Sequence, residues 1–312
     1  MKVIFHYAAG PALSARLAAL PDLSVTVCSE SDDTKLMELL PEADVLWHVL
    51  KPVTAAMMAR APKLRLIQKI GVGVNTIDLE AAKERGIAVC NLPGTNARAV
   101  AELTLALMLA TVRRLPLFDA AMRDGSAWAL DPTVQDNLGE LGGRTVGLVG
   151  YGAVPRLLAP VLNALGCNLL YTARVQHADA LGKFRSLKTL LAEVDILSLH
   201  VTLTSETRHL IDSAAIRRMR RGAVLINTAR GELVDQAALT EALRDGHLAA
   251  AGLDVFVEEP PNPAELLLTL PNVVVTPHIG WLTTGTFDRS FALAAENCRR
   301  LAVGETLLHR VV

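Results

Sequence analysis

The sequence predicts an α/β protein with two doubly wound domains, each a parallel β-sheet covered by helices on both faces. The chain has 312 residues, which is the length of about two domains. Half of its residues (51%) are apolar, enough to fill substantial cores. Short β-branched runs alternate with amphipathic, Ala/Leu-rich runs from end to end. This alternation is typical of parallel strands joined by crossover helices.

The first block of alternating segments covers roughly residues 1–98. A helix is expected after Pro11, and another after Thr54, which is a plausible N-cap. A third is expected from Asp78 to Arg85, ending at Gly86, where a left-handed residue terminates a helix. The candidate strands are Val3–Phe5, Ser24–Val27, Val45–Val49, Leu66–Ile70 and Ala88–Cys90.

A long helix is expected from about Asn96 to Val112, and the glycine-rich stretch from Gly125 to Gly143 is interpreted as connecting loop. The second block then begins at Arg144, and its clearest helix is Asp235–Arg244. Its candidate strands are Thr145–Val149, Asn168–Tyr171, Ile196–Leu199, Val224–Asn227, Ala250–Asp254 and Val273–Thr276.

The last helix, from about Thr283 to Val303, could pack on either block, because its periodicity fits both. We assign it to the first block. The expected domains are therefore residues 1–98 together with 284–312, and residues 99–283.

Composition and charge exclude several classes of function. The net charge is −1 and no basic block stands out, so nothing indicates binding to nucleic acid or to an anionic membrane. The most apolar run, Leu103–Val112, has about half of the ~20 residues that cross a bilayer. The four cysteines form no cluster, so we expect no metal site and no disulfide, and a cytoplasmic location.

A glycine motif opens the second block. An apolar strand leads into Gly150-Tyr151-Gly152, and a helix is expected to begin at Ala153 and Val154. In a dinucleotide-binding (Rossmann) unit, such glycines permit a tight turn and let the backbone approach a pyrophosphate at the helix N-terminus. The third glycine of the motif is replaced by Pro155, which the first turn of a helix tolerates.

The type of nicotinamide cofactor is predicted from the end of the next strand. An acidic residue there would bind the adenosine ribose hydroxyls and repel a 2′-phosphate. The segment Tyr171-Thr172-Ala173-Arg174 has no acid, and Arg174 offers a guanidinium to a phosphate. We therefore favour NADP(H) over NAD(H).

Three further segments follow candidate strands, at the sheet edge where open α/β proteins bind ligands. They are Asn227-Thr228-Ala229-Arg230-Gly231, Gly252–Pro260 and Thr276-Pro277-His278-Ile279-Gly280. With Gly71–Asp78 and Ala101–Thr104, they resemble the D-isomer-specific 2-hydroxyacid dehydrogenase family in motif order along essentially the whole chain. Glyoxylate/hydroxypyruvate reductases of this family have a cofactor strand with a similar Tyr-Thr-small-Arg ending, which adds weight to NADP(H).

The resemblance implies a flavodoxin-like substrate domain, a Rossmann cofactor domain and a catalytic triad. Arg230 would bind the substrate carboxylate and orient its carbonyl, because a guanidinium matches a carboxylate bidentately. His278 would be the general acid for keto-acid reduction and the base in the reverse direction, because histidine titrates near neutrality. Glu259 would pair with the imidazole and favour its protonated form.

The resemblance also implies roles at the cofactor and the substrate. Asp254 would hold the nicotinamide carboxamide, and Thr104 would approach the nicotinamide. The backbone of Val72 and Gly73 would hold the substrate carboxylate. Trp281 stands where relatives more often have a small residue, and narrowing of the substrate channel and packing at the domain hinge are equally open. The full set expected to bind cofactor is Gly150, Gly152, Ala153, Val154, Thr172, Ala173, Arg174, Thr104, Thr228, Ala229, Asp254 and Gly280.

The expected function is hydride transfer between NADP(H) and a small 2-keto or 2-hydroxy acid such as glyoxylate or hydroxypyruvate. The resemblance also implies a homodimer with the helix near Asn96–Val112 in the interface, although burial within one chain would equally explain the apolarity of that helix. Two alternatives remain open. One is a non-enzymatic nicotinamide sensor like the corepressor members of the family, which can keep the triad. The other is a phosphite- or formate-type dehydrogenase, because the same architecture serves those anions.

Overall fold

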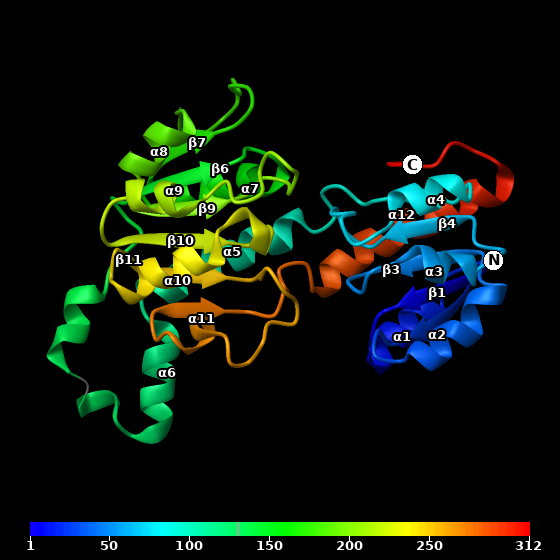
Figure 1. Cartoon of the computed structure of the whole chain (residues 1–312), viewed down its shortest axis with the longest axis horizontal. Helices are drawn as coiled ribbons and strands as arrows, with labels where there is room; N and C mark the ends of the chain where they lie inside the picture. The colour runs from blue at the N-terminus through cyan, green and yellow to red at the C-terminus, as the bar shows by residue number, and fades with distance from the viewer. Residues whose placement is uncertain (130) are drawn as a thin grey trace. The chain divides into compact units, whose positions relative to one another are not determined.

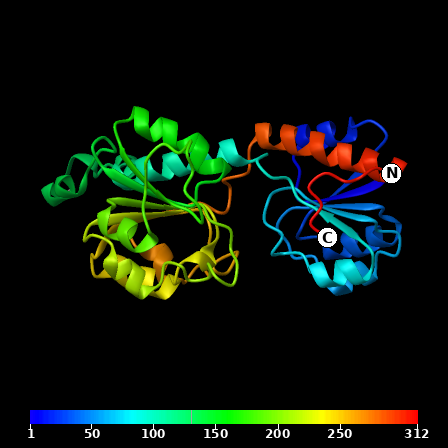
Figure 2. The same ribbon diagram turned by 90° about the horizontal axis from the view of Figure 1, so that it is seen from above.

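The computed structural model describes residues 1–129 and 131–312, which form two compact units. Unit 1 comprises Met1–Asn96 and Thr283–Val312, and unit 2 comprises Ala97–Leu282 (Figure 1). Each unit is a parallel β-sheet between layers of helices, seen edge-on in Figure 2. The predicted α/β fold with two parallel sheets is confirmed.

The sheet of unit 1 has five parallel strands in the order β2-β1-β3-β4-β5. This is the flavodoxin-like strand order, in which ligands bind at the carboxyl ends of the strands. The strands are β1 (Lys2–His6), β2 (Ser24–Cys28), β3 (Val45–His48), β4 (Leu66–Lys69) and β5 (Ala88–Cys90). The helices are α1 (Pro11–Ala18), α2 (Asp33–Leu39), α3 (Ala55–Ala59), α4 (Leu79–Glu84) and α12 (Thr284–Val303).

Local signals that were visible in the sequence fix these helices. The Thr54 hydroxyl accepts a hydrogen bond from the Met57 N–H (3.3 Å), as expected of an N-cap.

The last helix, α12, belongs to unit 1, where Phe291 stacks on Trp47 with the ring centroids 5.6 Å apart. Phe291 also meets the edge of Phe5 at 5.6 Å. An aromatic layer thus closes one face of this sheet.

The sheet of unit 2 has seven parallel strands in the order β12-β11-β10-β9-β6-β7-β8. They are β6 (Thr145–Val149), β7 (Asn168–Thr172), β8 (Lys183–Phe184), β9 (Ile196–Leu199), β10 (Ala223–Asn227), β11 (Leu248–Leu253) and β12 (Val273–Val275). Helices α5 (Ala97–Val112) and α7 (Ala153–Ala164) cover one face. Helices α8 (Leu187–Glu193), α9 (Ser213–Arg218) and α10 (Gln236–Arg244) cover the other, and α11 (Leu266–Thr269) precedes β12.

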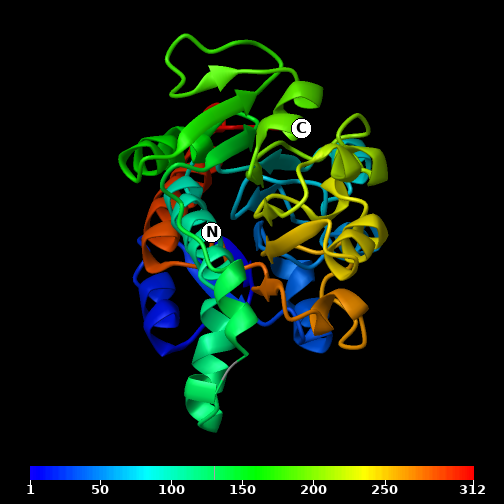
Figure 3. The same ribbon diagram turned by 90° about the vertical axis from the view of Figure 1, so that its left-hand side faces the viewer.

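Two elements of unit 2 were not predicted. Strand β8 has two residues, too few to show a period. Helix α6 (Leu115–Asp124) follows α5 and projects from the body of unit 2 (Figures 1 and 3). Its C-cap is Gly125 in the left-handed region (φ 80°), so the first glycine of the expected loop ends a helix. The rest of that stretch holds two short 3₁₀ turns, and residue 130 within it lies outside the described residues.

Over the described ranges, no helix is both long enough and apolar enough to cross a membrane.

Candidate active site

Three neighbouring strands of unit 2 are each followed by a segment that carries a predicted catalytic residue. Arg230 follows β10, Glu259 lies in the segment after β11, and His278 follows β12. These strands are parallel and adjacent, so the three residues lie at one edge of the sheet. That edge is where the carboxyl ends of the strands meet, the usual ligand-binding edge of an open α/β sheet.

Glu259 and His278 form a short hydrogen-bonded pair, with 2.6 Å between Oε2 of the glutamate and Nδ1 of the imidazole. The other glutamate oxygen accepts a hydrogen bond from the Phe256 N–H (3.0 Å). Burial raises the pKa of Glu259, but the hydrogen bond from His278 and the charges of His278 and Arg230 outweigh it, so the net pKa is lowered. The ionised carboxylate fixes the ring through Nδ1 and leaves Nε2 to exchange a proton.

The turn that carries His278 is held by the buried carboxylate of Asp254. Oδ1 of Asp254 accepts hydrogen bonds from the Thr276 hydroxyl (2.6 Å) and the Ile279 N–H (2.9 Å), and Oδ2 accepts one from the Gly280 N–H (2.8 Å). A Cβ on Gly280 would lie 2.9 Å from that oxygen. His278 itself has a left-handed backbone (φ 54°), so an anchored turn keeps an uncommon conformation in place.

We expect the substitution Asp254→Asn to lower the free energy of unfolding by about 1–3 kcal/mol, because an amide NH₂ would replace an acceptor that faces backbone N–H groups. Chemical denaturation measures the change. The matched control is Asp235→Asn, since Asp235 is an N-cap that accepts from the Ala238 N–H, and asparagine caps equally well. Equal stabilities of the two variants would contradict the anchoring role of Asp254.

Arg230 is positioned by the turn that follows β10. The side chain of Asn227 spans this turn, donating to the Arg230 carbonyl (2.8 Å) and accepting from the Ala229 N–H (3.0 Å). A Cβ on Gly231 would lie 2.0 Å from the carbonyl carbon of Phe256, so only glycine lets this turn approach the segment that leads to Glu259. Burial lowers the pKa of Arg230, while Glu259 and Glu232 raise it.

The glycine motif forms a tight turn between β6 and α7. Gly150 has φ 96°, and a Cβ there would lie 2.8 Å from the His200 carbonyl oxygen. Gly152 is the N-cap of α7, with no side-chain cap and nothing within 4 Å of an added Cβ. Pro155 is buried in the first turn and does not interrupt the helix. A helix N-terminus without a side-chain cap, with open space beside Gly152, suits an anionic group.

The remaining predicted cofactor residues lie at carboxyl ends of strands or beside them. Thr172 ends β7, and Ala173 and Arg174 follow it, with Arg174 exposed. The Thr104 hydroxyl on α5 is buried, donates to the Val100 carbonyl (2.7 Å) and bonds to the Thr228 hydroxyl (2.9 Å). This bond ties α5 to the turn before Arg230.

The predicted substrate residues are divided between the units. Trp281 is buried in unit 2 (6% exposed). Val72 and Gly73 lie in the loop after β4 of unit 1, where the Val72 carbonyl accepts from the Asn91 side chain (2.9 Å). The same loop is tied to β3, because the His48 Nε2 and the Thr76 hydroxyl are 2.8 Å apart. Burial lowers the pKa of His48 well below its ordinary value, so this imidazole is neutral.

Sequence reasoning missed one charged pair beside the glycine turn, between Arg156 on α7 and Asp179 after β7. The two residues are too far apart in the chain for spacing to reveal the pair.

Across residues 1–129 and 131–312, no group of three or more His, Cys, Asp or Glu side chains could hold a metal ion.

Comparisons with known proteins agree with this geometry. A family model described as "D-isomer specific 2-hydroxyacid dehydrogenase, NAD binding domain" matches residues 105–280. The chain is 40% identical to a glyoxylate reductase of Aeropyrum pernix, over 86% of this chain and 83% of that protein. It is 39% identical to the D-3-phosphoglycerate dehydrogenase of Mycobacterium tuberculosis, over 93% of this chain and 55% of that protein, about half of its length.

A solved structure extends the likeness to the whole chain. The NADPH-dependent glyoxylate/hydroxypyruvate reductase of Sinorhizobium meliloti, crystallised with NADP and malonate, superposes with a TM-score of 0.83. It is 28% identical, and the superposition covers 100% of this chain and 96% of that one.

Proposed function

Since the chain belongs to the D-isomer specific 2-hydroxyacid dehydrogenase family and is an NAD(P)-dependent oxidoreductase, we propose a substrate class and a cofactor for it. The protein reduces small 2-keto acids such as glyoxylate or hydroxypyruvate, and its reductant is NADPH. The observation that carries the proposal is the 2.6 Å pair of His278 and Glu259 at the same sheet edge as Arg230. A fixed proton donor beside a half-buried guanidinium suits a substrate with a carboxylate next to a carbonyl.

In the proposed reaction, Arg230 binds the substrate carboxylate and polarises the neighbouring carbonyl. When bound, the nicotinamide cofactor supplies the hydride for the carbonyl carbon. His278 donates the proton from Nε2 to the carbonyl oxygen, so that one hydride and one proton convert the 2-carbonyl group to a 2-hydroxyl group. Glu259 stabilises the imidazolium before the transfer and keeps the ring oriented after it.

The residues proposed to hold the cofactor fit a dinucleotide. The pyrophosphate would lie against Gly150, Gly152, Ala153 and Val154, where the first turn of α7 offers uncapped N–H groups. The ribose of the adenosine would lie beside Thr172, Ala173 and Arg174. The nicotinamide end would be held by Thr104, Thr228, Ala229, Asp254 and Gly280.

The preference for NADPH rests on Arg174. Its guanidinium is exposed after β7, and the segment from Tyr171 to Arg174 contains no carboxylate that would repel a 2′-phosphate. The similar reductase from S. meliloti is NADPH-dependent. The substitution Arg174→Asp should reverse the preference. A variant that still prefers NADPH would count against this assignment.

The two motif glycines are expected to respond differently to alanine. Gly150→Ala should reduce the free energy of unfolding by about 1–3 kcal/mol, because its Cβ would collide with the His200 carbonyl at a positive φ. Gly152→Ala should fold normally, since nothing lies within 4 Å of its Cβ. The variant should nevertheless bind NADPH about tenfold more weakly, because the added methyl group occupies the space proposed for the pyrophosphate. Thermal melting measures the effect on folding, and fluorescence titration measures the effect on NADPH binding. An unchanged dissociation constant for NADPH in Gly152→Ala would contradict the proposed pyrophosphate site.

The substrate is proposed to contact Arg230, His278, Trp281 and the backbone of Val72 and Gly73. If the large ring of Trp281 narrows the site, Trp281→Ala should improve the turnover of bulkier 2-keto acids relative to glyoxylate. Unchanged relative rates would assign Trp281 to packing alone.

Initial rates of NADPH and NADH oxidation with glyoxylate, hydroxypyruvate and pyruvate test the proposed function. Fast NADPH oxidation with either of the first two would support both the substrate class and the cofactor. A preference for NADH would keep the chemistry and overturn the cofactor assignment. Cofactor binding without turnover of any 2-keto acid would favour a sensor, and oxidation of formate, phosphite or 3-phosphoglycerate instead would identify a different dehydrogenase.

We also propose that the protein is a cytoplasmic homodimer. The segment from Leu115 to Trp128, which begins with α6, exposes three large apolar side chains: Leu115, Met122 and Trp128. Trp128 is 94% exposed. Such apolar exposure on a projecting element suits contact with a second copy of the chain. Light scattering that gives the mass of a monomer would exclude the dimer.

A further inference from the structure

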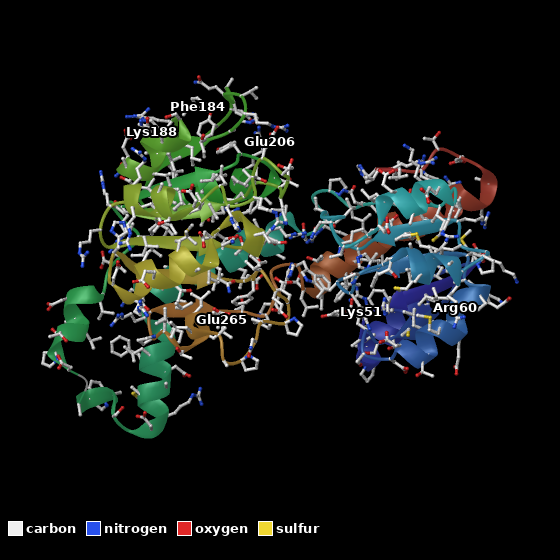
Figure 4. The ribbon with its side chains drawn as sticks, viewed as in Figure 1. Lys51, Arg60, Phe184, Lys188, Glu206 and Glu265 are labelled. Carbon is white, nitrogen blue, oxygen red and sulfur yellow. The ribbon has the colours of Figure 1, made fainter. Side chains whose placement is uncertain are left out.

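The loop that follows β7, residues 173–182, is held by the hydroxyl of Tyr151 in the glycine turn and by the hydroxyl of Tyr171 in β7. The Tyr151 hydroxyl accepts a hydrogen bond from the Leu181 N–H (2.8 Å), and the Tyr171 hydroxyl accepts one from the His177 N–H (2.9 Å). Phe184, labelled in Figure 4, lies in β8 directly after this loop and packs edge-on against Tyr171 with the centroids 5.5 Å apart. The loop therefore has a defined place beside the motif glycines.

This loop brings a carboxylate to the first turns of α7. Arg156 forms an ion pair with Asp179, and its second terminal nitrogen lies 3.3 Å from Nδ1 of His177. The guanidinium carbon also lies 5.4 Å from the centre of the Tyr151 ring. The pKa of Asp179 is lowered, chiefly by the hydrogen bond from Arg156, so the pair is ionised at neutral pH.

The position of the pair matters for the choice of cofactor. In a Rossmann unit the pyrophosphate lies at the helix N-terminus, and the adenosine ribose lies at the end of the second strand. Arg156 comes from that helix, and Asp179 from the loop that begins at that strand end, five positions after Arg174. A carboxylate in this region repels a 2′-phosphate, whereas a guanidinium attracts it.

We propose that Asp179 and Arg156 determine the cofactor preference together with Arg174, an inference that rests on the proposed use of NADPH. Arg156 exchanges Asp179 for the adenosine 2′-phosphate when NADPH binds, and Asp179 limits the preference by competing for Arg156 and by repelling the phosphate. Both side chains are solvent-accessible, at 38% and 66%, and ion pairs of such exposure are weak enough to exchange.

The substitution Asp179→Asn is expected to tighten NADPH binding about threefold to fivefold, because it removes a negative charge near the phosphate and frees Arg156. NADH lacks the phosphate, so its dissociation constant should change less than twofold. Arg156→Gln should weaken NADPH binding about fivefold to tenfold and leave NADH binding within twofold. Both effects should shrink in 0.5 M salt.

Fluorescence titration of the protein with NADPH and with NADH, in the absence of substrate, measures these constants. The matched control is Glu241→Gln, which removes the acid of another exposed ion pair, with Arg244 on α10 (2.5 Å). It should alter neither constant. In the Arg156→Gln background, adding Asp179→Asn should increase the affinity for NADPH less than it does in the unmodified protein, because part of its effect acts through Arg156.

The ratio of the two dissociation constants in the unmodified protein tests the proposed function, and the change of that ratio in the variants tests this inference. A shift toward NADPH in Asp179→Asn supports the inference even if the unmodified protein prefers NADH. An unchanged ratio, or a shift toward NADH, in a variant with an unchanged melting temperature overturns it.

Discussion

The substitution His278→Asn is expected to lower the turnover number for 2-keto acid reduction by about 10²–10⁴-fold, the typical contribution of a general acid. The imidazole is fixed by Glu259 at 2.6 Å, and an asparagine at this position cannot deliver a proton. Asparagine is the informative replacement because it tolerates the left-handed backbone at φ 54°, whereas alanine would add strain to the loss of the acid.

The control for this variant is His309→Asn, since His309 has nearly the same backbone conformation (φ 51°) but lies in the C-terminal segment of unit 1. It should keep full turnover. Steady-state kinetics at saturating cofactor, with melting temperatures of all variants, separates chemistry from folding. Turnover of His278→Asn within a few-fold of the unmodified protein would remove His278 from the role of acid.

The second large effect is expected for Arg230→Gln, which should lower kcat/KM for 2-keto acids by about 10²-fold, since each lost hydrogen bond between charged groups is worth about 1.5–3 kcal/mol. Part of the loss should appear in kcat, because in the proposed reaction the guanidinium also polarises the carbonyl. Arg230→Lys should be intermediate, since an ammonium keeps the charge but lacks the planar fork.

Cofactor binding in the absence of substrate provides the internal comparison for Arg230. It should be nearly unchanged in Arg230→Gln. Arg220→Gln serves as the matched control, because Arg220 is an exposed arginine paired with Asp195 (3.0 Å) just before β10 begins. A loss confined to cofactor affinity would show that Arg230 does not bind the substrate.

The strands were predictable because buried parallel strands are short runs of mainly apolar residues. Thr145–Val149 and Ile196–Leu199 are examples, and their observed bounds equal the predicted ones. Helix ends were predictable where a single residue sets them. Asp78, for example, caps α4 by accepting from the Ala81 N–H (3.0 Å). Helix α6 was missed because its amphipathic pattern is short and because its N-cap is Arg114, a left-handed residue that no propensity marks.

The candidate site was predictable as far as its residues follow strands. Arg230, Glu259 and His278 each occupy a strand-end segment, and parallel strands bring such segments to one edge. The connections within the site depend on three-dimensional hydrogen bonding that no spacing reveals. The three bonds of Asp254 to the His278 turn and the pair of Arg156 with Asp179 are of this kind.

The discontinuous make-up of unit 1 has a consequence for how the chain matures during translation. The ribosome releases all of Ala97–Leu282 before α12, so unit 2 can complete its sheet while unit 1 still lacks its final helix. Until α12 arrives, Trp47 and Phe5 have no Phe291 to cover them. We expect a released fragment that ends at residue 282 to show a protease-resistant unit 2 and to bind chaperones through the uncovered aromatic face of the N-terminal segment.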